Sequence, residues 1–124
     1  MSDFDVLHRY TRQDALDDGV LVDVTAMAKE AGIVIPTALT AAVWGRCVGV
    51  PDGVEMQDEQ GRLWDVLWMF RMAGRNVKGN AVRFGVHVRN DDEEGEPPLV
   101  SLLAVCGPGD SGEPVITIMM PDES

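Results

Sequence analysis

A chain of 124 residues has room for one domain and one hydrophobic core. Its composition, 45% hydrophobic and 25% charged, is ordinary for a globular protein and excludes a chain that is disordered throughout. No apolar run approaches the roughly 20 residues of a membrane span, and the formal net charge of −11 disfavours direct binding to nucleic acid.

The charge is divided unevenly along the sequence. Residues 1–61 sum to −7, residues 62–90 to +5 and residues 91–124 to −9, and the last segment has no basic residue. Such charge speaks to partners more than to fold, because an acidic molecule is steered towards basic surfaces. The sequence leaves one alternative open, which is that acidity only keeps a small protein soluble.

The first elements in chain order are short. Thr11, followed by Asp14 at the third helical position, predicts a capped turn of helix that ends before Gly19. We expect a brief strand at residues 20–24 and a short helix at residues 26–31.

Two longer helices are predicted next. Residues 37–47 favour a helix because Leu39, Val43 and Cys47 repeat at helical spacing. The dominant helix is expected from residue 58 to residue 74, and nine of the eleven residues from 63 to 73 are apolar. We expect so apolar a helix either in the centre of the domain or partly covered by another chain. Its predicted core residues are Trp64, Leu67, Trp68 and Phe70.

The C-terminal half predicts strands at residues 82–88, 99–106 and 115–120, joined by loops rich in turn formers. The predicted fold class is therefore α+β, with short N-terminal helices and one long apolar helix packed on a three-stranded antiparallel meander. We expect a single domain over residues 1–124, and disorder of the acidic tail at residues 121–124 stays open.

This topology predicts an acidic cluster. Successive loops of a meander lie at opposite ends of the sheet, so the first loop and the C-terminal tail should emerge at the same end. Seven carboxylates without an intervening cation would gather there, and a solvated loop with a frayed tail is the alternative. The predicted partner-binding residues are Asp91, Asp92, Glu93, Glu94, Glu96, Asp122 and Glu123.

The basic segment offers an alternative site for an anion or a nucleic acid. Its flexible stretch at residues 74–79 matches no phosphate-loop pattern, and neutralisation by acidic surfaces of the same chain is the simpler interpretation. The residues of this alternative site are Arg71, Arg75, Lys78, Arg83, His87 and Arg89.

Catalytic and metal-binding patterns are weak. Residues 109–114 resemble the motif around the nucleophile of trypsin-like serine proteases, but Val43 stands where the general base should be. Asp65 and His87 are conceivable acid–base groups, and neither has a visible partner. No set of His, Cys or carboxylate residues has metal-ligand spacing, so we predict no metal and no cofactor.

The sequence also bears on location. The N-terminus lacks the basic and apolar regions of a signal peptide, and the two cysteines, Cys47 and Cys106, show no disulfide framework. We therefore expect a reduced, cytoplasmic setting and no membrane association.

Four separated blocks, at residues 14–24, 38–44, 61–69 and 105–123, resemble an uncharacterised family of small acidic proteins carried on bacterial plasmids and integrative elements. The resemblance implies the cargo of mobile DNA, where small acidic proteins are often directed against host defence, and it supplies no catalytic motif.

These observations favour a non-enzymatic acidic interaction protein whose partner is a basic protein surface. The sharpest form of this hypothesis is an inhibitor of a host restriction or CRISPR nuclease that acts by nucleic-acid mimicry. The alternative is a nucleic-acid or nucleotide-binding module that uses the basic face at residues 71–89. A small hydrolase ranks third, and a homodimer stays an open possibility.

Overall fold

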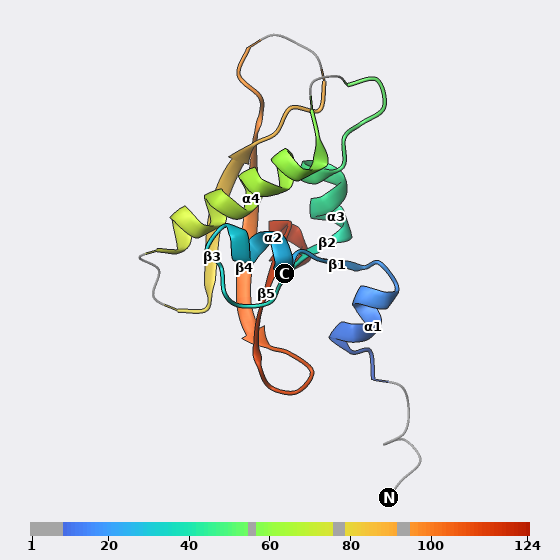
Figure 1. The fold of residues 1–124 in the computed structure, drawn as a ribbon, viewed down its shortest axis with the longest axis vertical. Helices are drawn as coiled ribbons and strands as arrows, with labels where there is room; N and C mark the ends of the chain where they lie inside the picture. Colours follow the sequence, from blue (N-terminus) through green and yellow to red (C-terminus); the bar gives the residue numbers. More distant parts are fainter. Residues whose placement is uncertain (1–8, 55–56, 76–78, 92–94) are drawn as a thin grey trace, which may run out of the picture.

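The computed structural model describes residues 9–54, 57–75, 79–91 and 95–124, which form a mixed sheet with helices on both faces (Figure 1). The elements in chain order are α1 (Arg12–Asp17), β1 (Leu21–Asp23), α2 (Thr25–Glu30), β2 (Thr37–Thr40), α3 (Ala41–Val43), the π-helical turn η2 (Trp44–Val48), α4 (Glu59–Gly74), β3 (Ala81–His87), β4 (Leu99–Pro108), β5 (Pro114–Met119) and the 3-10 turn η3 (Pro121–Glu123).

The sheet has five strands in the order β1-β2-β5-β4-β3. The predicted fold, a helix packed on a three-stranded antiparallel meander, is therefore wrong. The strands β3, β4 and β5 pair antiparallel in succession, but β2 pairs parallel to the outer edge of β5 and β1 pairs antiparallel to β2. The prediction failed because a parallel pair joins segments far apart in sequence, and no local pattern signals which distant strand a short segment will meet.

The strand β2 replaces the start of the helix that was predicted at residues 37–47. All four of its residues are buried, and Leu39 pairs with Val22 of β1 on one side and with Ile118 of β5 on the other. The helical periodicity misled because Leu39 reaches the core from a strand while Val43 and Cys47 reach it from the following turns. Pairing on both sides gives the buried backbone its hydrogen bonds, and this outweighs helical propensity.

The helix α4 does not pack as the long apolar helix that the sequence predicted. Its buried residues are Arg62, Leu63, Val66 and Leu67, whereas Trp64 is 36% exposed and Trp68 is 39% exposed. The predicted core therefore holds for Leu67 and is wrong for both tryptophans. Phe70 is half-buried and packs against the core. The physical reason is that one face of a helix suffices to cover the sheet, so Trp64, Trp68, Met69 and Met72 lie on its outward face.

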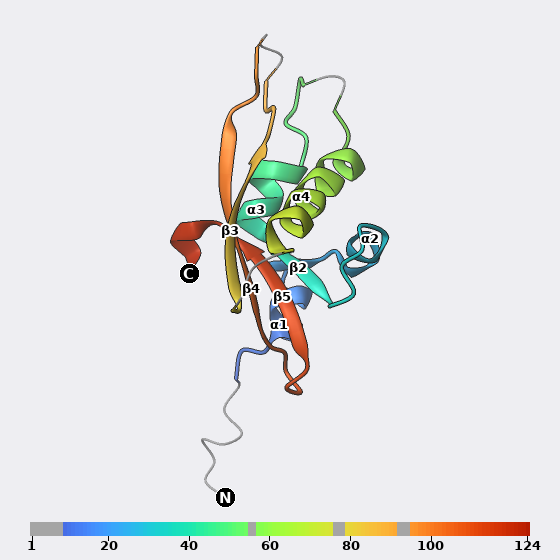
Figure 2. The same cartoon turned by 90° about the vertical axis from the view of Figure 1, so that its left-hand side faces the viewer.

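The helices lie on the two faces of the sheet unequally. Figure 2 shows α3 and α4 on one face and η3 on the other. The core lies beneath α4, where Leu39, Leu102 and Ile118 of the sheet are fully buried together with Val66 and Leu67 of α4. None of the helices in the described ranges has the length and apolar character needed to cross a membrane.

Candidate functional site

The helix α1 carries three aspartates on one side, because positions 14, 17 and 18 have the i, i+3, i+4 spacing of neighbours on a helix. Asp14 completes the predicted capping box with Thr11, each residue's side chain accepting from the other's backbone N–H at 3.0 Å. Asp17 accepts from Gln13 Nε2 at 2.9 Å, and Asp18 accepts from the Tyr10 hydroxyl at 3.1 Å. The donors to Asp17 and Asp18 are neutral, so these bonds hold the two carboxylates in place without cancelling their charge.

The loop between β4 and β5 brings two further carboxylates to the same place. Asp110 accepts hydrogen bonds from the backbone N–H groups of Arg12 and Gln13, at 2.8 and 3.0 Å, and thereby caps the N-terminus of α1. Glu113 accepts from the backbone N–H of Ser111 at 3.4 Å. The stretch that resembles a protease motif is therefore part of a tight loop, in which Gly112 adopts a φ of +86° and Asp110 serves as a helix cap.

Arg12 lies among these carboxylates, yet its guanidinium donates to neutral oxygens. Its Nη1 donates to Thr117 Oγ1 at 2.6 Å and its Nη2 donates to the carbonyl oxygen of Ile116 at 2.9 Å. Burial lowers the pKa of Arg12, and the nearby charges of Asp110, Asp23 and Glu113 oppose that shift. The Arg12 guanidinium therefore bonds to neutral oxygens, although the carboxylates of Asp110 and Glu113 lie nearby.

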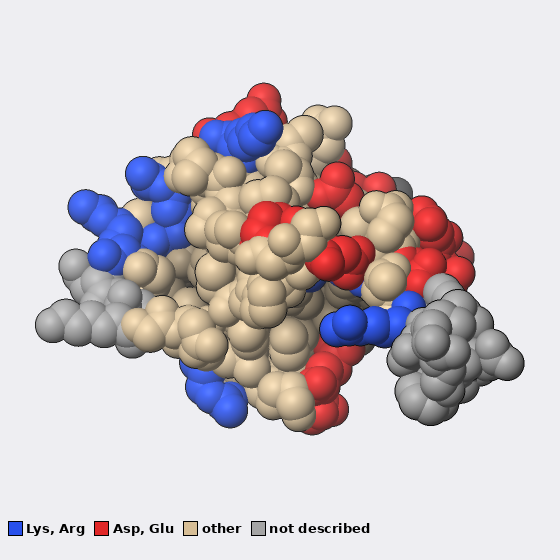
Figure 3. Space-filling model, turned by 90° about the horizontal axis from the view of Figure 1, so that it is seen from below, with Lys and Arg blue, Asp and Glu red and all other residues tan. Residues whose placement is uncertain are grey.

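We call this region the acidic patch. Figure 3 views the molecule from the end where α1 and the β4–β5 loop lie, with carboxylates gathered towards the side of α1 and basic side chains towards the side where α4 ends. Arg9 and Arg12 offset part of the negative charge of the patch. The acidic patch consists of Asp14, Asp17, Asp18, Asp23, Asp110 and Glu113.

The sequence predicted an acidic cluster at the other end of the molecule. Its described residues do not gather there but lie apart along the sheet. The strand β5 ends at Met119 opposite Leu103, four residues from Leu99, where the preceding loop enters β4. At about 3.3 Å per residue, the tail leaves the sheet roughly 13 Å short of that loop. Glu123 then accepts from Thr40 Oγ1 at 2.8 Å, and Asp122 is exposed in η3. The predicted residues Asp92, Glu93 and Glu94 lie outside the described residues.

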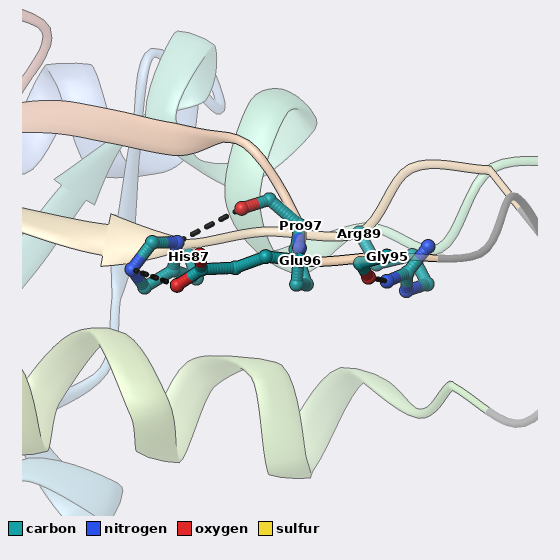
Figure 4. Close-up of polar contacts among 5 residues, drawn as sticks. All are labelled: His87, Arg89, Gly95, Glu96 and Pro97. Carbon is teal, nitrogen blue, oxygen red and sulfur yellow. Dashed lines mark hydrogen bonds and ion pairs between the residues drawn. The ribbon is translucent and has the colours of Figure 1, made fainter.

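The two described acids of the predicted loop lie near basic side chains, and Figure 4 shows Glu96 beside His87. Glu96 Oε1 is 3.4 Å from His87 Nε2, and Asp91 Oδ1 is 3.7 Å from Arg89 Nη1. His87 Nδ1 also contacts the carbonyl oxygen of Pro97 at 2.8 Å, and Arg89 Nη2 donates to the carbonyl oxygen of Gly95. The contact of Arg89 with Asp91 places opposite charges of one chain side by side.

The predicted basic residues do not share one face. Phe84 and Val86 of β3 point into the core beneath α4, so the alternating Arg83 and His87 point to the opposite side of the sheet. Arg71 lies on α4 and Arg75 at its C-terminal end. Lys78 falls outside the described residues.

Arg62 is a buried cation that sequence reasoning did not single out. It is 6% exposed, and Nε donates to the carbonyl oxygen of Cys47 at 3.0 Å. Its Nη1 and Nη2 donate to the carbonyl oxygen of Arg89 at 2.7 Å and to Asn90 Oδ1 at 2.6 Å. Burial lowers the pKa of Arg62. Arg62 joins α4, the π-helical turn and the segment just after β3, which is a structural role.

The described residues offer little for catalysis or metal binding. No group of three His, Cys, Asp or Glu side chains in the described ranges could hold a metal ion. A cavity of about 130 Å³ between the end of α4 and the sheet is lined by apolar and small residues, with Asn80 and Cys106 as its polar side chains. Asp65 has its pKa raised by burial and by Asp58, and lies on α4 away from that cavity.

The acidic patch was missed by sequence reasoning for a clear reason. The spacing of Asp14, Asp17 and Asp18 was visible within the predicted turn of helix, and it alone could have signalled a charged face. The approach of Asp110 to α1 could not be seen, since it depends on contacts between residues 97 and 98 positions apart.

The structure defines a small α+β protein with a mixed five-stranded sheet and an acidic patch at one end. Its whole length, residues 1–124, matches the family model described as Family of unknown function (DUF6573), and the chain belongs to that family. No curated protein and no solved structure matches it.

Proposed function

We propose that this protein is a non-enzymatic interaction protein that binds a basic protein surface through its acidic patch. The observation that carries the proposal is the manner in which the carboxylates are held. Asp17, Asp18 and Asp110 accept from an amide, a hydroxyl and backbone N–H groups, so their positions are fixed while their charges remain available. Ordered carboxylates lose little conformational freedom when a cationic partner binds.

The proposed partner is a protein that binds nucleic acid, because such a protein presents arginine and lysine side chains to phosphate groups. A fixed array of carboxylates offers these side chains comparable acceptors. The sequence resemblance to proteins of plasmids and integrative elements makes a host restriction or CRISPR nuclease the partner of first choice. The protein would then occupy the nuclease surface that otherwise holds DNA or RNA.

A capture experiment followed by kinetics tests the proposal. The immobilised protein is exposed to bacterial lysate with and without added double-stranded DNA. Proteins that are captured only in the absence of DNA are then purified. Association rates are then measured against salt concentration. We expect Asp17→Asn with Asp18→Asn to slow association severalfold and to flatten its salt dependence, because exposed charges steer encounter.

The matched control removes the same two charges elsewhere, by Asp91→Asn with Glu96→Gln in the loop predicted from sequence. Both variants have the same net charge, so a difference between them reports where the partner binds. Slowing by the control alone would transfer the site to that loop. Equal association rates for both variants and the unmodified protein would show that the acidic residues serve only solubility.

A further inference from the structure

The outward face of α4 concentrates exposed apolar side chains. Eight large hydrophobic residues are exposed among the described residues, and four of them lie on this helix. Their exposed fractions run from 36% to 42%, which is unusual for tryptophan and methionine side chains grouped on one element. The four are Trp64, Trp68, Met69 and Met72.

The aromatic part of this face is ordered without a partner. The rings of Trp64 and Trp68 stack with their centroids 5.9 Å apart and an interplanar angle of 12°. The Arg71 guanidinium carbon lies 5.6 Å from the Trp68 ring centroid and packs against Gly32, where a side chain would leave no room for it. A surface already in place loses little entropy on binding, and rigid aromatic residues with arginine are the side chains that dominate protein interfaces.

Two residues of opposite charge, Asp65 and Arg71, lie on the two sides of Trp68. Asp65 lies three positions before Trp68 and Arg71 three positions after it, and at 100° per residue they flank it on opposite sides by about 60°. Gly61 and Arg75 stand seven positions before and after Trp68, and Trp64 and Met72 four positions. A second α4 laid antiparallel across Trp68 would therefore bring each of these residues to the height of its counterpart.

We propose that α4 packs antiparallel against α4 of a second copy of this chain, in a two-fold symmetric dimer centred on Trp68. Asp65 then faces Arg71 of the second copy, and Trp64 faces its Met72. Arg75 of the second copy lies over Gly61, in a shallow groove that is lined by Asp58, Trp64 and Asp65. A cation suits this groove because Trp64 and the carboxylates of Asp58 and Asp65 line it. Arg62 lines it too, but its guanidinium donates to the carbonyl oxygens of Cys47 and Arg89.

The dimer must overcome the repulsion of two chains that each carry a net charge of −11. That repulsion is screened over about 8 Å at physiological ionic strength. The proposed ion pairs between Asp65 and Arg71 of the second copy act at shorter range. A stable interface buries about 800 Å² per chain. This is roughly a tenth of the 7848 Å² surface of the chain. The acidic patch lies on other elements, so this proposal does not depend on the proposed function.

Charge reversal in two separate variants gives a specific test. In Asp65→Arg alone, or in Arg71→Asp alone, a symmetric dimer would contain two like-charged pairs. In an equimolar mixture of the two variants, the heterodimer contains only opposite pairs. We expect sedimentation equilibrium to show dimers for the unmodified protein, dimerisation weakened at least about tenfold for each variant, and recovery in the mixture.

A second test uses the centre of the interface. Trp68→Ala should abolish dimerisation, whereas Leu99→Ala, which truncates an exposed apolar side chain of β4, should leave it unchanged. Thermal unfolding of dilute samples verifies that each variant is folded. A protein that is monomeric at every concentration would overturn the proposal. So would a dimer that tolerates both charge reversals, or a mixture that fails to form heterodimers.

Discussion

The guanidinium of Arg62 donates to the backbone carbonyl oxygen of Arg89 at 2.7 Å, so a buried cation of α4 fixes the backbone just after β3. The cation has three neutral acceptors and no ion pair with a carboxylate in the described part of the chain. Such an arrangement depends on the planar fork of arginine, which reaches several acceptors at once. A cation without these acceptors would be costly to bury.

We expect Arg62→Met to destabilise the protein by on the order of 3 kcal/mol, because the carbonyl oxygens of Cys47 and Arg89 would lose their donor. Arg62→Lys should recover less than half of this loss, since a single ammonium group cannot reach all three acceptors. Urea unfolding monitored by circular dichroism measures both variants. Full stability in Arg62→Lys would show that only the charge matters.

Capping of α1 by Asp110 predicts a second effect. Asp110→Ala should lower the free energy of unfolding by about 1 kcal/mol, because two backbone N–H groups lose their acceptor. Asp122→Ala is the matched control, since Asp122 is exposed and its change removes the same charge. Equal unfolding free energies for the two variants would contradict a capping role.

Truncations on the two sides of α4 should differ sharply. Leu67 is fully buried, so Leu67→Ala should cost about 2–5 kcal/mol in unfolding free energy. Trp68 is 39% exposed, and Trp68→Ala should cost about 1 kcal/mol at protein concentrations where the chain is monomeric. Chemical denaturation of dilute samples compares them. A larger loss for Trp68 than for Leu67 would reverse the two sides of the helix.

The two cysteines should differ in chemical behaviour. Burial raises the pKa of the Cys47 thiol to about 11, so the thiolate that attacks alkylating agents is scarce at pH 8. Cys106 is half-buried beside a cavity. We expect iodoacetamide to modify Cys106 first and to reach Cys47 only on unfolding, as mass spectrometry of a time course would show. Modification of both at one rate would refute this expectation.

The same shift makes stability depend on alkaline pH. The folded state holds the Cys47 proton more tightly than the unfolded state, whose thiol has a pKa near 9.0. The stabilising contribution is complete below pH 9 and is lost as the pH rises towards 11, at up to about 1.4 kcal/mol per pH unit. Cys47→Ala should remove this part of the pH dependence, which unfolding curves between pH 8 and pH 11 would reveal.

Local signals found the elements more readily than their arrangement. The pair Thr11 and Asp14 marked α1 correctly, because a capping box acts over three residues. The alternation that was seen at residues 82–88 falls on β3, where one face is buried and the other exposed. Pairing of β2 with β5 was not predictable, since it joins residues nearly eighty positions apart.

Burial on α4 shows the other limit of sequence reasoning. A nearly continuous apolar sequence reports the number of hydrophobic side chains, not the area available to cover them. Val66 and Leu67 fill the space above the sheet, and Trp64 and Trp68 are left outside. The same limit applies to the acidic patch, whose members come from α1, β1 and the β4–β5 loop.

The parallel pair of β2 and β5 constrains how the chain is made. During synthesis β2 leaves the ribosome before β5 exists, so β2 can pair with β1 on one edge while its other edge has no strand to pair with. The central position of β5 between β2 and β4 means that the sheet closes last at its middle. An unpaired strand edge is prone to aggregation, and we expect the aspartates of α1 to counter it until β5 emerges.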